Sequence, residues 1–225
     1  MDFVKSLQKD KISQMVKDLG VDIDINVTPA KVVFMALLRS TGREGIGKLL
    51  SYLEKSDFFE APASTKFHGN YKGALCVHSL GVAALLLEKN KTLNLGLTTS
   101  NCLIAGLLHD LCKTNFYTTT SRNMKINGRW ESVDSYLVDD QFPLGHGEKS
   151  AMMAMQFISL KKPELMMIRW HMGPFSGAND YDFNNAVNFM PEIMAMYTAD
   201  SETTALMEIT LKPEEGIVLP PEKII

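Results

Sequence analysis

Two long apolar segments place the strongest constraint on how this chain can fold. One runs from about Gly73 to Lys89, and the other from Thr99 or Ser100 to Cys112. Both have the length of a helix, and both carry too few polar positions to lie on a protein surface. A helix that is apolar on all sides must be covered by other parts of the chain. We therefore expect these two segments to form the centre of a helical domain.

Shorter helices are predicted on both sides of this pair, where apolar residues recur with the period of an α-helix. The predicted ranges are 3–19, 29–42, 46–59, 147–160, 163–171 and 183–206, and Pro191 should kink or restart the last of these helices. Between residues 114 and 138, aromatic and threonine residues favour β structure around Asn127-Gly128, the dipeptide most typical of a tight hairpin turn. The predicted fold class is mainly α, with one inserted β-hairpin.

The 225 residues are enough for one domain with a sizeable core. We expect residues 1–60 to form N-terminal helices that pack on the core. Residues 61–207 should form the core itself, with the hairpin at about 115–138. Residues 208–225 contain several prolines and are expected to be an extended tail on the body or a disordered end.

Charge and composition argue against several classes of function. The 23 basic and 26 acidic residues give a formal charge of -3, so the chain lacks the positive surface that binding to duplex nucleic acid requires. No run reaches the roughly 18 apolar residues of a membrane span. The charged first eleven residues are unlike a secretory signal, so we expect a cytoplasmic protein with no membrane partner. The cysteines match no zinc motif and lie within apolar helical runs, which predicts free, buried thiols at Cys76, Cys102 and Cys112.

The most informative polar residues are His109 and Asp110, which directly follow six apolar or small residues. Burial of that carboxylate without a partner would cost several kcal/mol, and a divalent cation bound by both side chains is the most economical compensation. Four further candidate ligands lie at or within predicted helices, namely His78, His146, His171 and Asp200. Imidazole nitrogens together with carboxylate oxygens suit Zn, Mn, Fe, Co or Ni. Any one of these histidines taken alone is more often structural, so the argument depends on the whole set.

The order of these residues resembles the HD-domain superfamily of metal-dependent phosphohydrolases, whose ligands are His, His-Asp and Asp on successive helices. The matching segments are 73–80 around His78, 106–113 around His109-Asp110, and 197–200 ending at Asp200. The resemblance covers roughly residues 66–203. It implies an HD-like helical bundle around a site for divalent transition metals.

Lys113 refines the resemblance. The single-metal 5'-nucleotidases of the superfamily have a glutamate at this place, whereas a lysine is similar to the branch with two metals. That branch has two further histidines before the final aspartate, which His146 and His171 match in order. The resemblance implies metal one at His78, His109, Asp110 and Asp200, and metal two at His146 and His171, with Asp110 bridging. Two metals about 3.5–4 Å apart can share a water or hydroxide that acts as the nucleophile.

The expected reaction is therefore hydrolysis of a nucleotide or another small phosphoester by a metal-bound hydroxide. Asp110 and Lys113 are the expected catalytic residues, with Lys113 also binding the phosphate; the alternative is a solvated lysine at a helix end. The hairpin cations Arg122, Lys125 and Arg129 are expected to bind substrate if the hairpin lies over the metals. The alternative is that these three residues are solvated charges on an edge strand and bind nothing. His68 matches no ligand position and is expected to be peripheral or to contact a ligand.

Two other functions are compatible with the same residues. One is a mixed-valent di-iron oxygenase of the same superfamily, and the other is a nucleotide-binding module without turnover. Retention of all six candidate ligands argues against a binding module without turnover.

Overall fold

The computed structural model describes residues 6–65, 68–126, 128–177 and 180–208 of the chain. Its helices are α1 (Ser6–Asp18), α2 (Ala30–Ser40), α3 (Ile46–Lys55), α4 (Ala74–Leu93), α5 (Thr99–Leu108), α6 (His146–Met155), α7 (Lys162–Trp170), α8 (Asp180–Phe189) and α9 (Glu192–Glu202). Two strands, β1 (Tyr117–Ile126) and β2 (Arg129–Val138), form an antiparallel hairpin between α5 and α6. The prediction of a mainly α fold with an inserted hairpin is confirmed.

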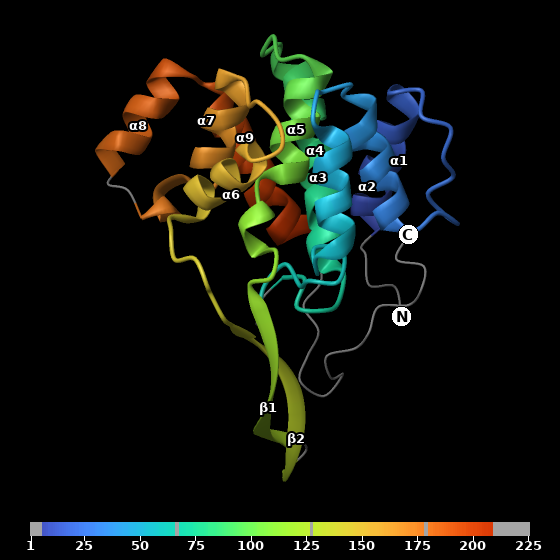
Figure 1. The fold of residues 1–225 in the computed structure, drawn as a ribbon, viewed down its shortest axis with the longest axis vertical. Helices are drawn as coiled ribbons and strands as arrows, with labels where there is room; N and C mark the ends of the chain where they lie inside the picture. Colours follow the sequence, from blue (N-terminus) through green and yellow to red (C-terminus); the bar gives the residue numbers. More distant parts are fainter. Residues whose placement is uncertain (1–5, 66–67, 127, 178–179, 209–225) are drawn as a thin grey trace.

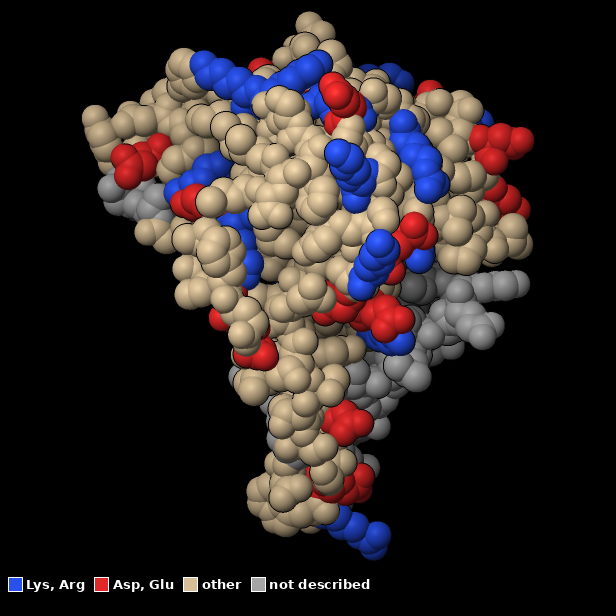
Figure 2. Space-filling model, in the orientation of Figure 1, with Lys and Arg blue, Asp and Glu red and all other residues tan. Residues whose placement is uncertain are grey.

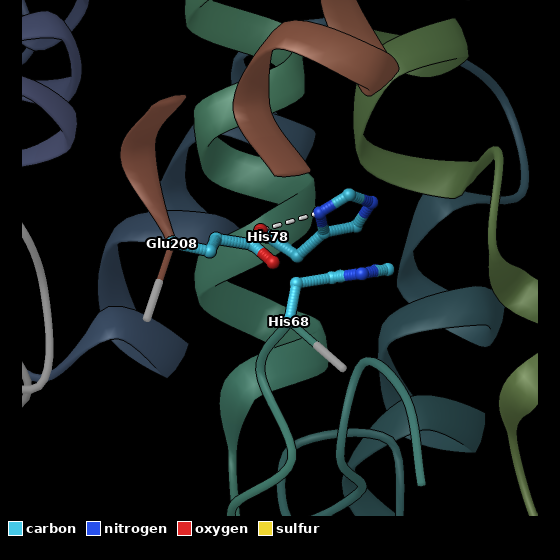
Figure 3. Close-up of side chains that lie close together, drawn as sticks. All are labelled: His68, His78 and Glu208. Atoms are coloured by element: carbon cyan, nitrogen blue, oxygen red, sulfur yellow. Dashed lines mark hydrogen bonds and ion pairs between the residues drawn. The ribbon is translucent and has the colours of Figure 1, made fainter. Parts of the chain in front are cut away.

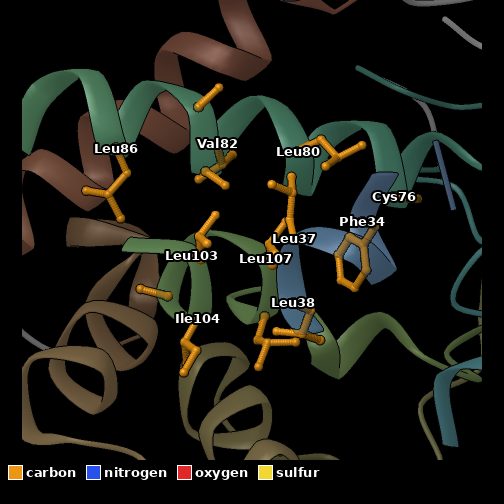
Figure 4. Close-up of a cluster of buried hydrophobic side chains, with 14 of the residues drawn as sticks. Phe34, Leu37, Leu38, Cys76, Leu80, Val82, Leu86, Leu103, Ile104 and Leu107 are labelled. Carbon is orange, nitrogen blue, oxygen red and sulfur yellow. The ribbon is translucent and has the colours of Figure 1, made fainter. Parts of the chain in front are cut away.

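The two apolar segments form α4 and α5, which lie in the middle of the helical body (Figure 1). Every residue of α4 from Ala74 to Leu86 is buried, and so is every residue of α5 from Asn101 to Leu108. Their side chains pack against those of α2 in the main hydrophobic core (Figure 4). Cys76, Cys102 and Cys112 are free and buried, as predicted.

A glycine allows α4 and α5 to approach each other closely. A Cβ atom added to Gly106 would lie 2.5 Å from the Cα atom of Ala83, which is backbone and cannot move aside. The backbones of the two helices are therefore in direct contact at this point. His78 lies five residues from Ala83 on α4, and His109, which caps α5, lies three residues from Gly106, so each is within about one and a half turns of the contact.

The remaining helices cover this pair from two sides. α1, α2 and α3 lie on one side, and α6, α7 and α9 lie on the other, with α8 outermost (Figure 1). Pro191 separates α8 from α9, so the predicted helix restarts at this proline. Among the described residues, no helix is both long and apolar enough to cross a membrane.

A buried ion pair fixes α7 against the body. Glu164 is fully buried, and Arg43 donates to its two carboxylate oxygens at 2.5 and 2.9 Å. The Asn101 side chain at the start of α5 donates to the same carboxylate at 2.9 Å. Since His171 directly follows α7, this network also helps to hold the position of that histidine.

The α5 helix ends four residues earlier than predicted. His109 still has helical backbone angles, but Asp110 leaves the helix with φ -103° and ψ 22°, and Leu111–Lys113 form a 3-10 turn. The apolar pattern continues through this break because Leu111 and Cys112 are also buried. Burial alone therefore could not reveal where the helix stops.

The hairpin projects away from the helical body as a long two-stranded ribbon (Figure 1). Ile126 pairs with Arg129, so the loop has two residues as predicted, although Asn127 lies outside the described residues. Ten residues at about 3.3 Å each put the end of β1 roughly 30 Å from its start. The base of the hairpin is therefore close to α5, and its tip is far from it.

The contact at Gly106 can be tested by a single substitution. We expect Gly106→Ala to lower the free energy of unfolding by about 1–3 kcal/mol, because the added methyl group meets backbone that cannot repack. Gly47→Ala is the matched control, since a Cβ atom there has nothing within 4 Å. It should leave stability unchanged or raise it by up to about 1 kcal/mol. Urea unfolding followed by circular dichroism measures both, and equal stability of Gly106→Ala and the wild type would contradict the close contact.

Candidate metal centre

Six side chains that are far apart in the sequence meet at the end of α4 and α5 nearest the hairpin. They are His78 of α4, His109 and Asp110 at the end of α5, His146 at the start of α6, His171 at the end of α7 and Asp200 of α9. His78 Nε2 lies 3.1 Å from His109 Nε2 and 3.2 Å from Asp200 Oδ1. His146 Nε2 lies 2.8 Å from Asp110 Oδ1, and His171 Nε2 lies 3.5 Å from the same oxygen. The structure thus brings together all six residues predicted as metal ligands.

Two of these histidines are oriented by the helix that each one ends. His109 Nδ1 donates to the carbonyl of Gly106 at 2.8 Å, and His171 Nδ1 donates to the carbonyl of Ile168 at 2.7 Å. A carbonyl only accepts, so Nδ1 carries the proton in each ring and Nε2 is left with a lone pair. These carbonyls belong to the last turn of a helix, where they need such a partner. Both Nε2 atoms therefore face the cluster as potential ligands.

Asp110 lies at the centre of the cluster, and its two oxygens face different neighbours. Oδ1 faces His146 and His171, whereas Oδ2 lies 3.6 Å from His78 Nε2 and 3.5 Å from His109 Nε2. Burial by itself would raise the pKa of Asp110, but the positive charge of Lys113 holds it well below its usual range. Asp110 is therefore an ionised carboxylate that faces both groups of imidazoles.

Lys113 belongs to the cluster and is buried. Its ammonium group donates to Asp110 Oδ2 at 2.6 Å, and the residue is only 9% exposed. Burial would lower the pKa of Lys113, but the neighbouring carboxylate outweighs burial and raises it above its usual value. The alternative of a solvated lysine at a helix end is therefore wrong. The 3-10 turn after Asp110 places the lysine beside the carboxylate.

The donor set fits a transition-metal ion. His171 Nε2 is buried and has no hydrogen-bond partner among the described residues, which is costly unless an ion or another group binds there. Four groups of described side chains hold potential ligand atoms within 4.8 Å of one another, and three of them contain at least two of the predicted ligands: His78, His109 and Asp200; His109, Asp110 and His171; and Asp110, Cys112 and His146. Burial raises the pKa of the Cys112 thiol to about 12, so this thiol stays protonated and is a poor ligand. The remaining donors are imidazole nitrogens and carboxylate oxygens, the combination that divalent transition metals prefer.

The cluster is largely buried, but two of its residues are partly exposed. His146 and Asp200 have side chains that are 27% and 16% exposed, whereas the other four predicted ligands are almost completely buried. Solvent therefore reaches the cluster at His146 and Asp200.

The cations of the hairpin are not brought to the cluster. Lys125 and Arg129 are exposed and lie next to the turn at the far end of the ribbon. Arg122 lies in the second half of β1, and its side chain is outside the described part of the structure. In Figure 1 the hairpin extends away from the helical body and does not fold back over the helices. The arrangement favours the alternative of solvated edge-strand charges for Lys125 and Arg129.

The structure adds Glu208, which the sequence did not indicate as a site residue, and places His68 beside the His78 ring. Glu208 is buried, and its Oε1 accepts a hydrogen bond from His78 Nδ1 at 2.5 Å (Figure 3). His68, which matched no ligand position, lies with its ring 5.7 Å from that of His78. Burial lowers the pKa of the His78 imidazole, but the carboxylates of Glu208 and Asp200 outweigh burial and raise it to about 10. Nothing in the sequence around Glu208 marked it, because it follows the last helix in what resembled a tail.

These features define a helical protein with a buried histidine and aspartate centre suited to divalent metals. A family model described as the HD domain matches residues 76–213, which is more than half of the chain. The chain therefore belongs to the HD domain family, an all-α family whose members typically bind divalent metals. Among curated proteins and solved structures, none matches the chain.

Proposed function

We propose that this protein is a metal-dependent phosphohydrolase that acts on a nucleotide or another small phosphoester. The observation that carries the proposal is the position of Asp110, whose two oxygens face different imidazoles while the Lys113 ammonium lies at 2.6 Å. Membership of the HD domain family supports the same class of chemistry. A buried cation at the centre favours an anionic substrate over a neutral one.

We propose two ions, because a lysine at position 113 is similar to the branch of the superfamily that has two metals. His78, His109, Asp110 and Asp200 would hold the first ion, and His146, His171 and Asp110 would hold the second. Divalent ions at this place supply positive charge for phosphoryl oxygens and lower the pKa of water. The protein's own contribution is to fix the ligands before any substrate arrives, through the Nδ1 hydrogen bonds of His109 and His171.

Lys113 is proposed to stabilise negative charge on the phosphoryl group. A lysine ammonium has three N–H donors, and Asp110 accepts one of them. Because the side chain is largely shielded from water, its charge acts more strongly on a nearby anion than an exposed lysine would. Asp110 in turn keeps the ammonium in place, so Lys113 needs little reorganisation when charge develops.

The distribution of surface charge argues against a nucleic-acid duplex as substrate. The cluster opens beside His146 and Asp200, and the basic and acidic side chains on the face shown in Figure 2 are interspersed over the helical body. The positive tip of the hairpin is too far from the cluster to hold a small molecule bound there. We therefore assign phosphate binding to Lys113 and not to Lys125 or Arg129. The proposal excludes duplex nucleic acid as substrate.

The decisive experiment is a matrix of metals and substrates. Protein loaded with Mn, Fe, Co, Ni or Zn should release phosphate from at least one class of nucleotide or small phosphoester. Oxygen uptake is measured in the same reactions, because uptake with iron and no phosphate release would favour a di-iron oxygenase. Absence of both activities under every condition would favour a binding module without turnover.

Metal content tests the two proposed sites separately. The wild type should bind about two ions, His146→Ala and His171→Ala about one, and Asp110→Asn close to none, since the Asp110 carboxylate faces both sites. Elemental analysis after dialysis measures these values. Asp134→Asn, an exposed aspartate of the hairpin, is the control and should keep both ions. Full metal content in Asp110→Asn would exclude a shared carboxylate.

Lys113→Met should lower kcat by about 10²-fold for every phosphoester that the enzyme cleaves, because the lost charge acts on the phosphoryl group common to all of them. Lys89→Met is the matched control, since Lys89 also pairs with a carboxylate, that of Glu202 at 2.8 Å, but outside the cluster. Metal content is measured in both variants. An unchanged kcat for metal-loaded Lys113→Met would leave charge stabilisation to the metals alone.

A further inference from the structure

Glu208 contacts the metal centre from a part of the chain that follows the last α-helix. The carboxylate is buried, and it accepts the hydrogen bond from His78 Nδ1 (Figure 3). On the other side of the same ring, His78 Nε2 faces His109 and Asp200. The His78 imidazole is therefore held at one nitrogen and presented to the cluster at the other.

The need for this carboxylate follows from where His78 lies in its helix. His109 and His171 end their helices, so each can donate Nδ1–H to a carbonyl three residues earlier. His78 lies in the second turn of the twenty-residue helix α4, where the carbonyls accept hydrogen bonds from backbone amides of the helix itself. An external acceptor is required to fix this ring in the same tautomer, and Glu208 supplies it.

The backbone before Glu208 is shaped to deliver the carboxylate. Thr203–Met207 form a π-helical turn directly after α9, and the Glu208 amide donates to the Thr203 carbonyl at 3.2 Å. Such wider turns are rare and occur often at functional sites. This turn connects Asp200, a proposed ligand on α9, to Glu208, so the two carboxylates nearest to His78 come from one continuous segment.

We propose that Glu208 is a positioning residue of the metal centre, which holds His78 with its proton on Nδ1 and its Nε2 lone pair toward the first metal. The proposal rests on the metal site of the proposed function and extends it to a residue outside the six ligands. A carboxylate that accepts the second N–H of a ligating imidazole both orients the ring and strengthens it as a ligand.

A different use of the same residues is a further metal site. His68, His78 and Glu208 offer ligand atoms within 4.8 Å of one another, and Glu208 Oε2 has no hydrogen-bond partner among the described residues. However, Glu208 Oε1 and His78 Nδ1 are separated by 2.5 Å, the length of a short hydrogen bond. Two ligands of one ion, each at about 2.1 Å from it, would lie about 3 Å or more apart. The observed distance therefore favours positioning over ligation.

Zinc affinity tests the proposal without any assay of turnover. Competition with a chelator should show about 10- to 100-fold weaker binding of zinc in Glu208→Ala. Glu208→Gln should lie between this variant and the wild type, because an amide oxygen still accepts the hydrogen bond but lacks the charge. Glu202→Gln, a partly exposed glutamate at the end of α9, is the matched control and should bind zinc as the wild type does.

A spectroscopic measurement distinguishes positioning from a general loss of structure. With 15N-labelled histidine and bound zinc, NMR should show a protected Nδ1–H proton on His78 in the wild type and in Glu208→Gln, and its loss in Glu208→Ala. If Glu208→Ala does not fold, Glu208→Gln still tests the proposal, because it should bind zinc more weakly than the wild type and keep the His78 Nδ1–H signal.

Three results would overturn the proposal. They are wild-type zinc affinity in both Glu208 variants, a His78 proton on Nε2 in the zinc-loaded protein, and a zinc content that falls by one ion in both Glu208→Ala and His68→Ala. The last result would assign His68 and Glu208 to a separate metal site. Neither the affinity nor the NMR signal depends on hydrolysis, so a failure of this inference is distinct from a failure to release phosphate.

Discussion

The burial of the Asp110 carboxylate is the constraint on which the rest of the structure depends. An ionised group inside a helical core is stable only when it is surrounded by compensating charges and donors. Lys113 supplies one full positive charge at 2.6 Å, and four imidazoles have a ring nitrogen within 3.6 Å of the two carboxylate oxygens. The ends of α5 and α7, the start of α6 and the interior of α4 all converge on this one group. Removal of any of these helices would leave the carboxylate without part of its environment.

Much of the fold was predictable because strong local signals agree with the tertiary structure. The apolar character of α4 and α5 indicated a central pair, and the Asn127-Gly128 dipeptide indicated the hairpin. His109 and Asp110 stood out because two polar residues follow a run that must be buried. The resemblance to the HD superfamily then pointed to His78, His146, His171 and Asp200, and the structure brings all of them together.

Other features could not be predicted because they depend on distance in space. Glu208 lies 130 residues from His78, and no periodicity or motif connects the two. The reach of the hairpin was equally hidden, since a sequence position between Asp110 and His146 says nothing of the direction in which a ribbon extends. The end of α5 at Leu108 could not be predicted, because the 3-10 turn that follows is as buried as the helix itself. In each case the residues can be read from the sequence, but their structural role depends on contacts with segments that are far away in the chain.

The contact between Gly106 and Ala83 has a consequence for how the centre keeps its dimensions. Where two helices meet through side chains, a substitution in the core can be absorbed by a small shift of one helix against the other. Here the main chains themselves touch, so the separation of α4 and α5 is set by atoms that every amino acid shares. The spacing of His78 and His109 is therefore insulated from changes in the surrounding apolar residues. Apolar residues of the core can therefore change, with an effect on stability, while the distance between the two imidazoles stays the same.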